Sequence, residues 1–298
     1  MVPYISDEDV VNLAISPIQA MQWAKESFLI KNSALLPHKI SIPFEGDHYF
    51  NTMPVVIPSL NAMGVKVVSR YPGRIPTIDA QILLYNYQTG NLIDILDAAK
   101  ITEMRTGAVC ALTVQTLAVK NFTTMSVIGL GRIGKYSMQC ILEANKDRKF
   151  RIKLYRYKNQ AESFVEYFKH YENATFEIID DMRKFVEDAD VVISCITNAT
   201  GLLTQPEWFK KGVLLVPVHL KGFQNCDPVF EKIFGDDTSH ISEFKYFNQY
   251  RYFAELADVL QNKLPGREND SERIISYNVG LAIYDIVFAK HIVAMLNK

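Results

Sequence analysis

Met125-Ser-Val-Ile-Gly-Leu-Gly-Arg-Ile-Gly134 is the stretch that decides the fold, because an apolar run leads directly into the spacing Gly-x-Gly-x-x-Gly. A buried strand that turns through glycines into a helix presents backbone N–H groups to a pyrophosphate. The motif alone is weak evidence. Here a strand over residues 124–128 precedes it, and a helix over 135–144 and a strand over 151–157 follow. The alternative is a glycine-rich turn that serves only helix–strand packing.

The segments around this motif predict an α/β fold. After the glycines, strand-like and helix-like segments alternate up to residue 218, which favours right-handed crossovers and a mostly parallel sheet. Before it, residues 39–95 show short β-like runs punctuated by Pro, Gly and Asn. The expected strands cover 40–44, 52–57, 63–69, 81–87, 124–128, 151–157, 175–179, 191–197 and 213–218. The expected helices cover 7–12, 17–28, 101–120, 135–144, 160–171, 182–186, 253–263 and 280–296.

Three of the expected helices have recognisable features at their ends. Ser6 and Ser16 are predicted N-caps, the second followed by a proline at the first helical position, and Thr102 is the predicted cap of the long helix. The helix over 280–296 is apolar on most faces, so we expect it to be buried against another domain or subunit.

Composition limits the class of protein. The 298 residues, 48% of them apolar, suffice for two domains of ordinary size. A net charge of −1 without any basic block suggests neither a nucleic-acid partner nor a membrane surface. No apolar run reaches the roughly 18 residues of a spanning helix, and the N-terminus lacks the form of a signal peptide. We therefore expect a cytoplasmic enzyme.

Two residue types give negative indications. The four cysteines are scattered without a CxxC pair and look like buried helix or strand positions, so we interpret them as reduced packing residues. The His, Asp and Glu residues show no ligand spacing, so no catalytic metal is expected.

Several motifs recur in the order and spacing of one family. The distinctive ones are Met104-Arg-Thr-Gly-Ala108 and Gly280-Leu-Ala-x-x-Asp285. The others are Phe50-Asn-Thr-Met-Pro54, Gly64-Val-Lys66-Val-Val, Thr89-Gly90, Gly129-Leu-Gly-Arg-Ile-Gly134, Glu255-Leu-Ala-Asp258-Val and Pro265-Gly-Arg267. The chain resembles the ornithine cyclodeaminase/mu-crystallin family from Tyr4 nearly to the C-terminus.

This resemblance implies a domain organisation. A Rossmann-type NAD(P)-binding domain with a doubly wound parallel sheet, expected at residues 116–275, would be inserted in an α+β substrate-binding and dimerisation domain. That second domain would consist of residues 1–115 together with 276–298. The resemblance also implies a homodimer.

The choice of cofactor depends on the end of the second Rossmann strand. A carboxylate there accepts from the ribose 2′-OH of NAD, whereas arginine suits the 2′-phosphate of NADP. Lys153-Leu-Tyr155-Arg156-Tyr157-Lys158 contains no carboxylate. Arg156 aligns with the arginine of NADP-using relatives and Lys158 lies close to it, so NADP is favoured and NAD is possible. The alternative is a solvated pair of cations.

The full set of cofactor residues follows from the motifs and the resemblance. It comprises Arg105, Thr106, Gly129, Gly131, Arg132, Ile133, Gly134, Tyr155, Arg156, Lys158 and Thr197.

The resemblance also places basic residues around a substrate carboxylate. Lys66 matches the lysine of a Gly-x-Lys motif, Arg105 matches the arginine of Arg-Thr-x-Ala, and Lys39 takes a place often held by arginine. Met53 and Arg74 complete the expected substrate-binding set. Arginine binds a carboxylate with a fixed fork, and a desolvated lysine can move a proton. Each cation has the alternative of lying on the surface.

One departure from the family bears on the reaction. Cyclodeaminating relatives carry an aspartate after a Val-Gly pair, and here Val216-Pro-Val-His219-Leu-Lys221-Gly222 has Lys221 at that place. A cation there cannot accept from an ammonium group and repels a diamine. The family's next acidic residue is retained as Asp227. His219 is a candidate proton carrier near neutral pH, or a strand-end histidine bonded to the backbone.

Three functions remain open. The favoured one is an NAD(P)H-dependent oxidoreductase acting on a C–N bond of an amino-acid-like carboxylate: an imine reductase or amino-acid dehydrogenase, including oxidation of an N-carboxyalkyl amino acid. Lys66, His219 and Lys221 would then handle the proton. The second is a cyclodeaminase that recycles bound NAD, and the third is a non-catalytic NADPH-binding protein like mu-crystallin.

Overall fold

The computed structural model describes residues 3–197 and 199–297. The chain forms two compact units. Unit 1 consists of the chain up to Arg105 and from Gly280 onward, and unit 2 is the continuous stretch Thr106–Val279. The first division falls inside one helix, α3 (Ala99–Leu117). Within the described residues, no helix combines the length and apolar character that crossing a bilayer requires.

Unit 1 contains a six-stranded mixed sheet in the order β1-β6-β5-β4-β3-β2. Its strands are β1 (Tyr4–Ile5), β2 (Ile40–Phe44), β3 (His48–Ile57), β4 (Ala62–Arg70), β5 (Ile78–Asn86) and β6 (Leu92–Asp97). β1 pairs with β6 in parallel, and all other neighbours are antiparallel. Its helices, besides the start of α3, are α1 (Asp7–Asn12), α2 (Pro17–Ile30) and α9 (Ala282–Leu296).

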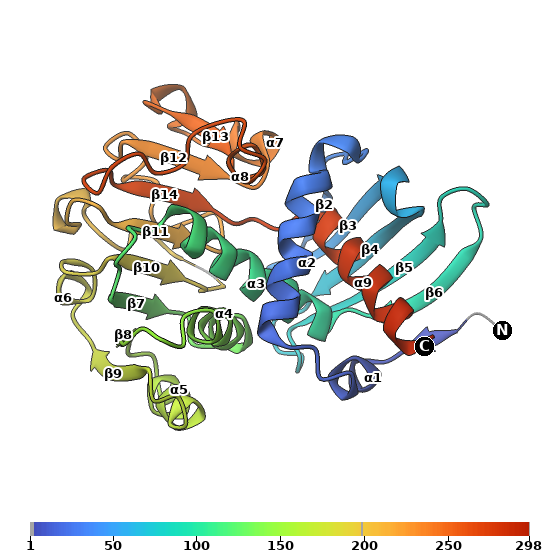
Figure 1. Ribbon diagram of the computed structural model, residues 1–298, viewed down its shortest axis with the longest axis horizontal. Helices are drawn as coiled ribbons and strands as arrows, with labels where there is room; N and C mark the ends of the chain where they lie inside the picture. Colours follow the sequence, from blue (N-terminus) through green and yellow to red (C-terminus); the bar gives the residue numbers. More distant parts are fainter. Residues whose placement is uncertain (1–2, 198, 298) are drawn as a thin grey trace. The chain divides into compact units, whose positions relative to one another are not determined.

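One face of this sheet is covered by the last helix. α9 packs on β3, β4 and β5 with α2 beside it (Figure 1). The contact is close at Gly64 of β4, where a Cβ would lie 2.5 Å from Ile286 Cδ1. The apolar surface of α9 is therefore buried inside its own unit, which removes the reason to expect another subunit against this helix.

Unit 2 is a doubly wound α/β sheet of eight parallel strands, in the order β13-β12-β14-β11-β10-β7-β8-β9. The strands are β7 (Thr124–Ile128), β8 (Phe150–Tyr155), β9 (Ala174–Ile179), β10 (Val191–Ser194), β11 (Leu214–Pro217), β12 (Lys232–Gly235), β13 (Phe253–Glu255) and β14 (Ile274–Tyr277). The helices, after the end of α3, are α4 (Arg132–Glu143), α5 (Gln160–Phe168), α6 (Met182–Val186), α7 (Thr238–Ile241) and α8 (Leu256–Leu260).

The sheet of unit 2 reverses its winding between β7 and β10. The strands that follow β7 directly lie on one side of it, and all later strands lie on the other. Such a switch point leaves a crevice outside the carboxyl ends of the strands, which is where α/β proteins bind ligands. The fold class predicted from the sequence is confirmed.

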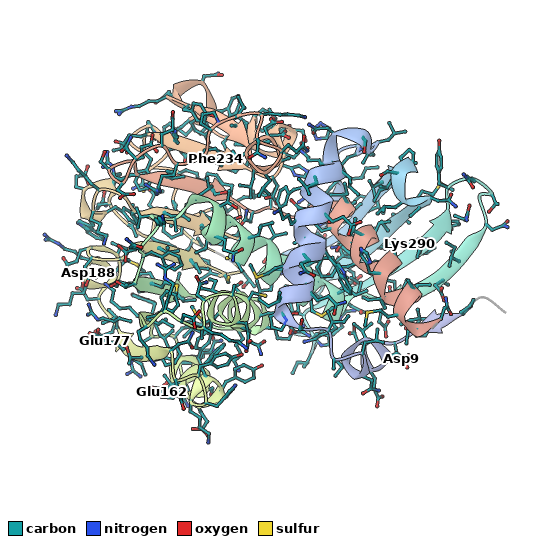
Figure 2. All side chains as sticks on the ribbon, viewed as in Figure 1. Asp9, Glu162, Glu177, Asp188, Phe234 and Lys290 are labelled. Atoms are coloured by element: carbon teal, nitrogen blue, oxygen red, sulfur yellow. The ribbon has the colours of Figure 1, made fainter. Side chains whose placement is uncertain are left out.

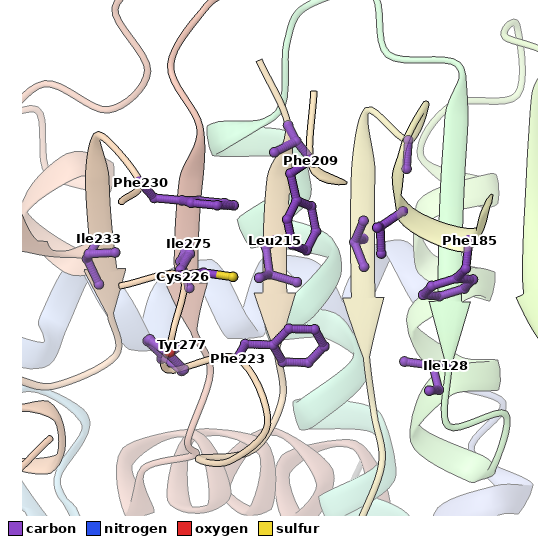
Figure 3. Close-up of a cluster of buried hydrophobic side chains, with 14 of the residues drawn as sticks. Ile128, Phe185, Phe209, Leu215, Phe223, Cys226, Phe230, Ile233, Ile275 and Tyr277 are labelled. Atoms are coloured by element: carbon purple, nitrogen blue, oxygen red, sulfur yellow. The ribbon is translucent and has the colours of Figure 1, made fainter. Parts of the chain in front are cut away.

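Apolar side chains fix the sheet of unit 2 to its covering segments. Ile128, Leu215 and Tyr277 at three strands, with Phe185 of α6, belong to one buried cluster (Figure 3). Cys226 is buried in the same cluster, and Cys110, Cys140 and Cys195 are also free thiols. Cys195 is half-buried and follows β10, so it is less enclosed than the sequence suggested.

Local capping signals were predicted correctly for the two N-terminal helices. The Ser6 hydroxyl accepts from the backbone N–H of Asp9, and the Asp9 carboxylate accepts from the backbone N–H of Ser6. The Ser16 hydroxyl accepts from the N–H of Gln19. The prediction of Thr102 as a cap is wrong, because α3 begins three residues earlier. Its N–H at Lys100 donates to the carboxylate of Asp7, 2.9 Å away.

Other differences come from contacts between distant segments. Residues 253–263 are not one helix: Phe253–Glu255 pairs in parallel with β12 before α8 begins. Strands β1, β6, β12 and β14 have no counterpart in the predictions. α3 ends at Leu117 rather than Lys120, and Arg267 Nε donates to the Leu117 carbonyl at 2.7 Å. The Pro-Gly-Arg motif therefore satisfies the C-terminus of a helix.

Candidate active site

The glycine turn of unit 2 has the conformation that the motif predicts. Gly129 has a φ of +85°, and a Cβ on it would lie 2.3 Å from the Cys195 carbonyl carbon. A Cβ on Gly134 would lie 2.4 Å from the Gly129 oxygen, so strand and helix approach closely. α4 begins at Arg132, hence the amides of residues 132–134 lie in its first turn, where N–H groups lack helical acceptors.

Gly131 differs from its two neighbours in the motif. A Cβ on it would meet no atom within 4 Å. It borders a pocket of about 430 Å³. The lining residues are Leu130, Gly131, Arg132, Lys135, Asn159, Gln160 and Ser163. Two cations, open space at the second glycine and unpaired first-turn amides fit the pyrophosphate of a dinucleotide.

Arg156 follows directly after β8, which ends two residues earlier than the predicted strand over 151–157. Its Nη1 lies 2.5 Å from Oε1 of Glu162 on α5, and both side chains are about half exposed; Figure 2 labels Glu162. Lys158 has a φ of +51°, and its Nζ lies 5.4 Å from the centre of the Tyr157 ring. Tyr155 packs its ring against Phe185, so its visible role is packing.

The end of β11 carries His219 and Lys221. The Oγ of Ser194 in β10 lies 2.6 Å from His219 Nε2, and the N–H of Lys221 donates to Nδ1. Both ring nitrogens are thus engaged within unit 2. Burial lowers the pKa of His219 to about 4, so this ring is neutral near pH 7. Lys221 is exposed, and Thr197, after β10, is exposed as well.

The acidic residue retained from the family pattern is part of the core of unit 2. Asp227 is fully buried and accepts from the Tyr277 hydroxyl at 2.6 Å and from the Tyr250 hydroxyl at 3.1 Å. Burial raises the pKa of this carboxyl to about 6. Asp227 connects β14 to the segment before β13 through these two hydrogen bonds, and it does not line the pocket at the glycine turn.

Unit 1 contains a cluster of charges that we call the Lys66 cluster, made of the buried Lys66, Arg105 and Asp285 and the half-buried Lys39. Lys66 Nζ lies 2.7 Å from Asp285 Oδ2, and Arg105 Nε lies 3.1 Å from Asp285 Oδ1. Asp285 has no exposed surface, and Lys66 is 2% exposed. One carboxylate from α9 therefore joins a lysine of β4 to an arginine of α3.

The electrostatics of this cluster favour an anion. Burial, Arg105 and Lys39 lower the pKa of Lys66 to about 8, against the raising effect of Asp285. Burial and Arg105 also lower the pKa of Lys39. Three cations facing one carboxylate leave net positive charge, so a bound carboxylate is electrostatically favoured.

The strand register and a glycine shape this cluster. Met53 of β3 is the cross-strand partner of Lys66, and both are buried. Lys39 directly precedes β2, whose first residue pairs next to Met53. A Cβ on Gly280 would lie 2.4 Å from Arg105 Nη1, so this glycine lets the guanidinium lie against the backbone.

Arg74 is not part of the cluster. Its guanidinium bonds the Pro76 carbonyl and the Ser69 hydroxyl and lies 3.8 Å from Asp79. Side chains alternate along β4, so Ser69 points to the opposite face from Lys66. The structure therefore brings Lys39, Met53, Lys66 and Arg105 together and separates Arg74 from them. Asp285 was missed, although it closes the Gly-Leu-Ala-x-x-Asp motif.

Thr106 follows Arg105 in α3 and is buried. Ile133 is half-buried in the first turn of α4. Within residues 3–197 and 199–297, no group of three or more His, Cys, Asp or Glu side chains is arranged to hold a metal ion.

A comparison with protein-family models identifies the family of the chain. The model of the ornithine cyclodeaminase/mu-crystallin family matches residues 6–297. The chain belongs to this family. A Delta(1)-pyrroline-2-carboxylate reductase from Bacillus cereus is 29% identical over 282 residues, covering 87% of this chain and 85% of the relative.

A second relative and a solved structure are also similar to the chain. An N-((2S)-2-amino-2-carboxyethyl)-L-glutamate dehydrogenase from Staphylococcus aureus is 28% identical over 222 residues, covering 69% of this chain and 64% of the relative. The structure of Thermococcus litoralis Delta(1)-pyrroline-2-carboxylate reductase in complex with NADH and L-proline matches with a TM-score of 0.89 at 23% identity. It covers 100% of this chain and 98% of that one.

Proposed function

We propose that this protein reduces the C=N bond of a cyclic ketimine monocarboxylate, with Δ1-pyrroline-2-carboxylate as the reference substrate. It is an NAD(P)H-dependent oxidoreductase acting on a C–N bond of an amino-acid-like carboxylate. The observation that carries the proposal is the Lys66 cluster, in which buried cations outnumber their one carboxylate.

The residues of this cluster divide the work. Arg105 uses Nε for Asp285, which orients its Nη groups as the fork for a substrate carboxylate. Lys39 adds a point charge. The pKa of Lys66 is lowered to about 8, close to neutral pH, so this lysine can hold a proton and release it to a substrate nitrogen. A reduced nicotinamide dinucleotide, held by the glycine turn of unit 2, supplies the hydride.

Within the cluster, geometry favours one carboxylate over two. Arg74, the fourth cation expected there, is engaged on the opposite face of the sheet with Asp79 and Ser69. The remaining cations are partly neutralised by Asp285. A monocarboxylate imine therefore fits better than an N-carboxyalkyl amino acid with several carboxylates.

The lyase alternative is weaker on the same grounds. Cyclodeamination needs an acceptor for an ammonium group. The carboxylate found in the Lys66 cluster is Asp285, and both of its oxygens already serve cations. His219 and Lys221 stay proposed as proton-handling residues, His219 in its neutral form.

We infer that NADP is the preferred cofactor. Arg156 and Lys158 follow the end of β8, where a ribose 2′-phosphate would lie in a Rossmann site, and Arg132 lines the pocket at the glycine turn. Glu162 holds Arg156 and lowers this preference, so NAD is also accepted.

The partner proposed for unit 1 is a second copy of the chain, with unit 1 as the substrate-binding and dimerisation domain. The sheet face opposite α9 carries an apolar pocket of about 830 Å³ in which Leu35, Pro54, Val56, Met63 and Val65 take part. Ile40, Ile42 and Phe44 of the edge strand β2 are also exposed. An exposed apolar face of this extent is typical of an interface.

The test is NADPH and NADH oxidation against a panel of cyclic ketimine carboxylates, with L-ornithine-dependent ammonia release measured in parallel. Steady oxidation with a five- or six-membered cyclic imine is expected. Ammonia release without net cofactor change would establish the lyase. Binding of NADPH without turnover of any imine, 2-oxo acid with amine, or N-substituted amino acid would favour the non-catalytic alternative.

A further inference from the structure

Asn51 of β3 has a buried acceptor that the described residues leave without a hydrogen bond. The side chain is 9% exposed, and its Oδ1 has no hydrogen-bond partner there. Leaving a buried carbonyl oxygen unpaired costs about 1–3 kcal/mol, so native proteins rarely keep one without a function. The oxygen is therefore a candidate for binding a donor from a ligand.

The strand register places Asn51 beside the Lys66 cluster. Asn51 and Met53 lie two residues apart on β3, so both side chains point to the same face. Met53 is directly opposite Lys66, which makes Asn51 the diagonal neighbour of Lys66 at about 7–8 Å between Cα atoms. A small molecule held by the cations thus lies within reach of the amide.

The chemistry of this amide complements that of its neighbours. Lys39, Lys66 and Arg105 only donate hydrogen bonds while charged, and Asp285 is occupied by two of them. A carboxylate at position 51 would be drawn to these cations, whereas a neutral amide oxygen stays available to an N–H group. A protonated cyclic imine carries its N–H on the atom next to the carbon that bears the carboxylate.

We propose that Asn51 Oδ1 accepts the hydrogen bond of the substrate's ring N–H while the Lys66 cluster holds the carboxylate. The inference rests on the proposed function and makes the site selective for nitrogen in the ring.

The test compares two ligands of equal shape. L-proline has the ring N–H, and tetrahydrofuran-2-carboxylate has a ring oxygen that can only accept. Binding to the NADP-loaded protein is measured by calorimetry, and imine reduction is measured separately. The parent protein is expected to bind L-proline about tenfold or more tightly than the oxygen analogue, because a buried acceptor rejects a ligand without a donor.

Three variants locate the effect. Asn51→Leu keeps the branched shape of the side chain without polar atoms and is expected to remove the preference for L-proline. Asn51→Asp introduces a carboxylate that the neighbouring cations attract, so it is expected to reduce the preference as well. Thr52→Val, on the same strand but the opposite face, is the matched control and should keep the preference intact.

Stability separates this role from a structural one. Because Asn51→Leu removes an unpaired polar group, it should raise the thermal midpoint of the ligand-free protein while it weakens L-proline binding. A lowered midpoint with unchanged ligand preference would overturn the inference. Equal binding of both ligands by the parent would overturn the inference about Asn51 but not the proposed function. Failure to reduce any imine and to bind either ligand would overturn both.

Discussion

The two units hold their charged groups in different ways. In unit 2, Arg156 and Glu162 lie six positions apart in the sequence and are about half exposed. In unit 1, Lys66, Arg105 and Asp285 come from three distant segments and are almost fully buried. An exposed ion pair is screened by water and contributes little to the free energy of folding. Removing one partner of a buried pair leaves an uncompensated buried charge and is strongly destabilising. Substitutions should therefore cost far more in unit 1.

The largest effect is expected for Asp285→Ala. Removing this carboxylate leaves Lys66 and Arg105 buried without their shared partner, which should lower the free energy of unfolding by about 3–5 kcal/mol. Urea unfolding measures it. The matched control is Glu166→Ala, which breaks an exposed pair with Lys169 and should stay within about 0.5 kcal/mol. Equal effects for the two variants would refute the contrast between the units.

Gly129→Ala and Gly131→Ala should differ in kind. In Gly129→Ala the new methyl group would clash with the backbone of Cys195, and alanine would have to adopt a positive φ. We therefore expect a loss of stability of about 1–3 kcal/mol. Gly131→Ala meets open space and should leave the thermal midpoint unchanged while NADPH affinity falls about tenfold, because a methyl group would occupy the approach to the pyrophosphate. Unchanged NADPH binding by Gly131→Ala would place the dinucleotide elsewhere.

Lys66 gives a pH dependence. Its pKa is lowered from 10.5 to about 8, so the affinity for a carboxylate ligand should be full below pH 8 and fall as the pH rises through it. Affinity for L-proline between pH 6 and 10 measures the effect, which should approach tenfold per unit above the pKa. Lys66→Arg stays charged and should flatten the profile; a parent profile that is already flat would assign the charge elsewhere.

The same shift fixes the sign of a stability effect. Because the folded pKa lies below the unfolded one, charged Lys66 opposes folding at neutral pH. This penalty fades as the pH rises from about 8 to 10.5. In that range the parent should gain stability relative to Lys66→Met.

The smallest effects are expected at Arg156. Arg156→Ala should weaken NADPH about five- to tenfold and leave NADH unchanged, since only the former offers a 2′-phosphate. Glu162→Gln frees Arg156 from an exposed pair worth about 0.2–1 kcal/mol and should strengthen NADPH up to about fivefold. Equal NADPH affinity in Arg156→Ala and the parent would reject the preference for NADP.

The sequence predicted best what depends on neighbouring residues. Ser6 and Ser16 cap helices a few positions away, the Gly129 and Gly134 backbones approach each other within the glycine turn, and each has its expected geometry. Thr102 failed because a distant carboxylate, Asp7, caps α3 instead. Strand β13 was missed because its pairing with β12 joins segments about twenty positions apart, and no local pattern encodes that contact.

The same distinction holds for the candidate site. Lys66 and Arg105 were found because each sits in a recognisable motif, but their shared partner Asp285 lies 180 positions beyond Arg105. Alternation along β3 offered a signal for Asn51, a polar residue in phase with the buried positions Met53, Val55 and Ile57. Strand alternation also separates Arg74's partner Ser69 from Lys66, once the strand is known.

The position of α9 after the whole of unit 2 in the sequence has a consequence for synthesis on the ribosome. Unit 2 is complete once Val279 has been made, and it can fold while unit 1 still lacks its last helix. Until Asp285 emerges, Lys66 and Arg105 have no shared counter-charge, and the apolar face of β3, β4 and β5 has no cover. The strands of unit 1 are therefore translated before unit 2 but covered only after it, and a chain cut between Val279 and Asp285 would join a folded unit 2 to an aggregation-prone sheet.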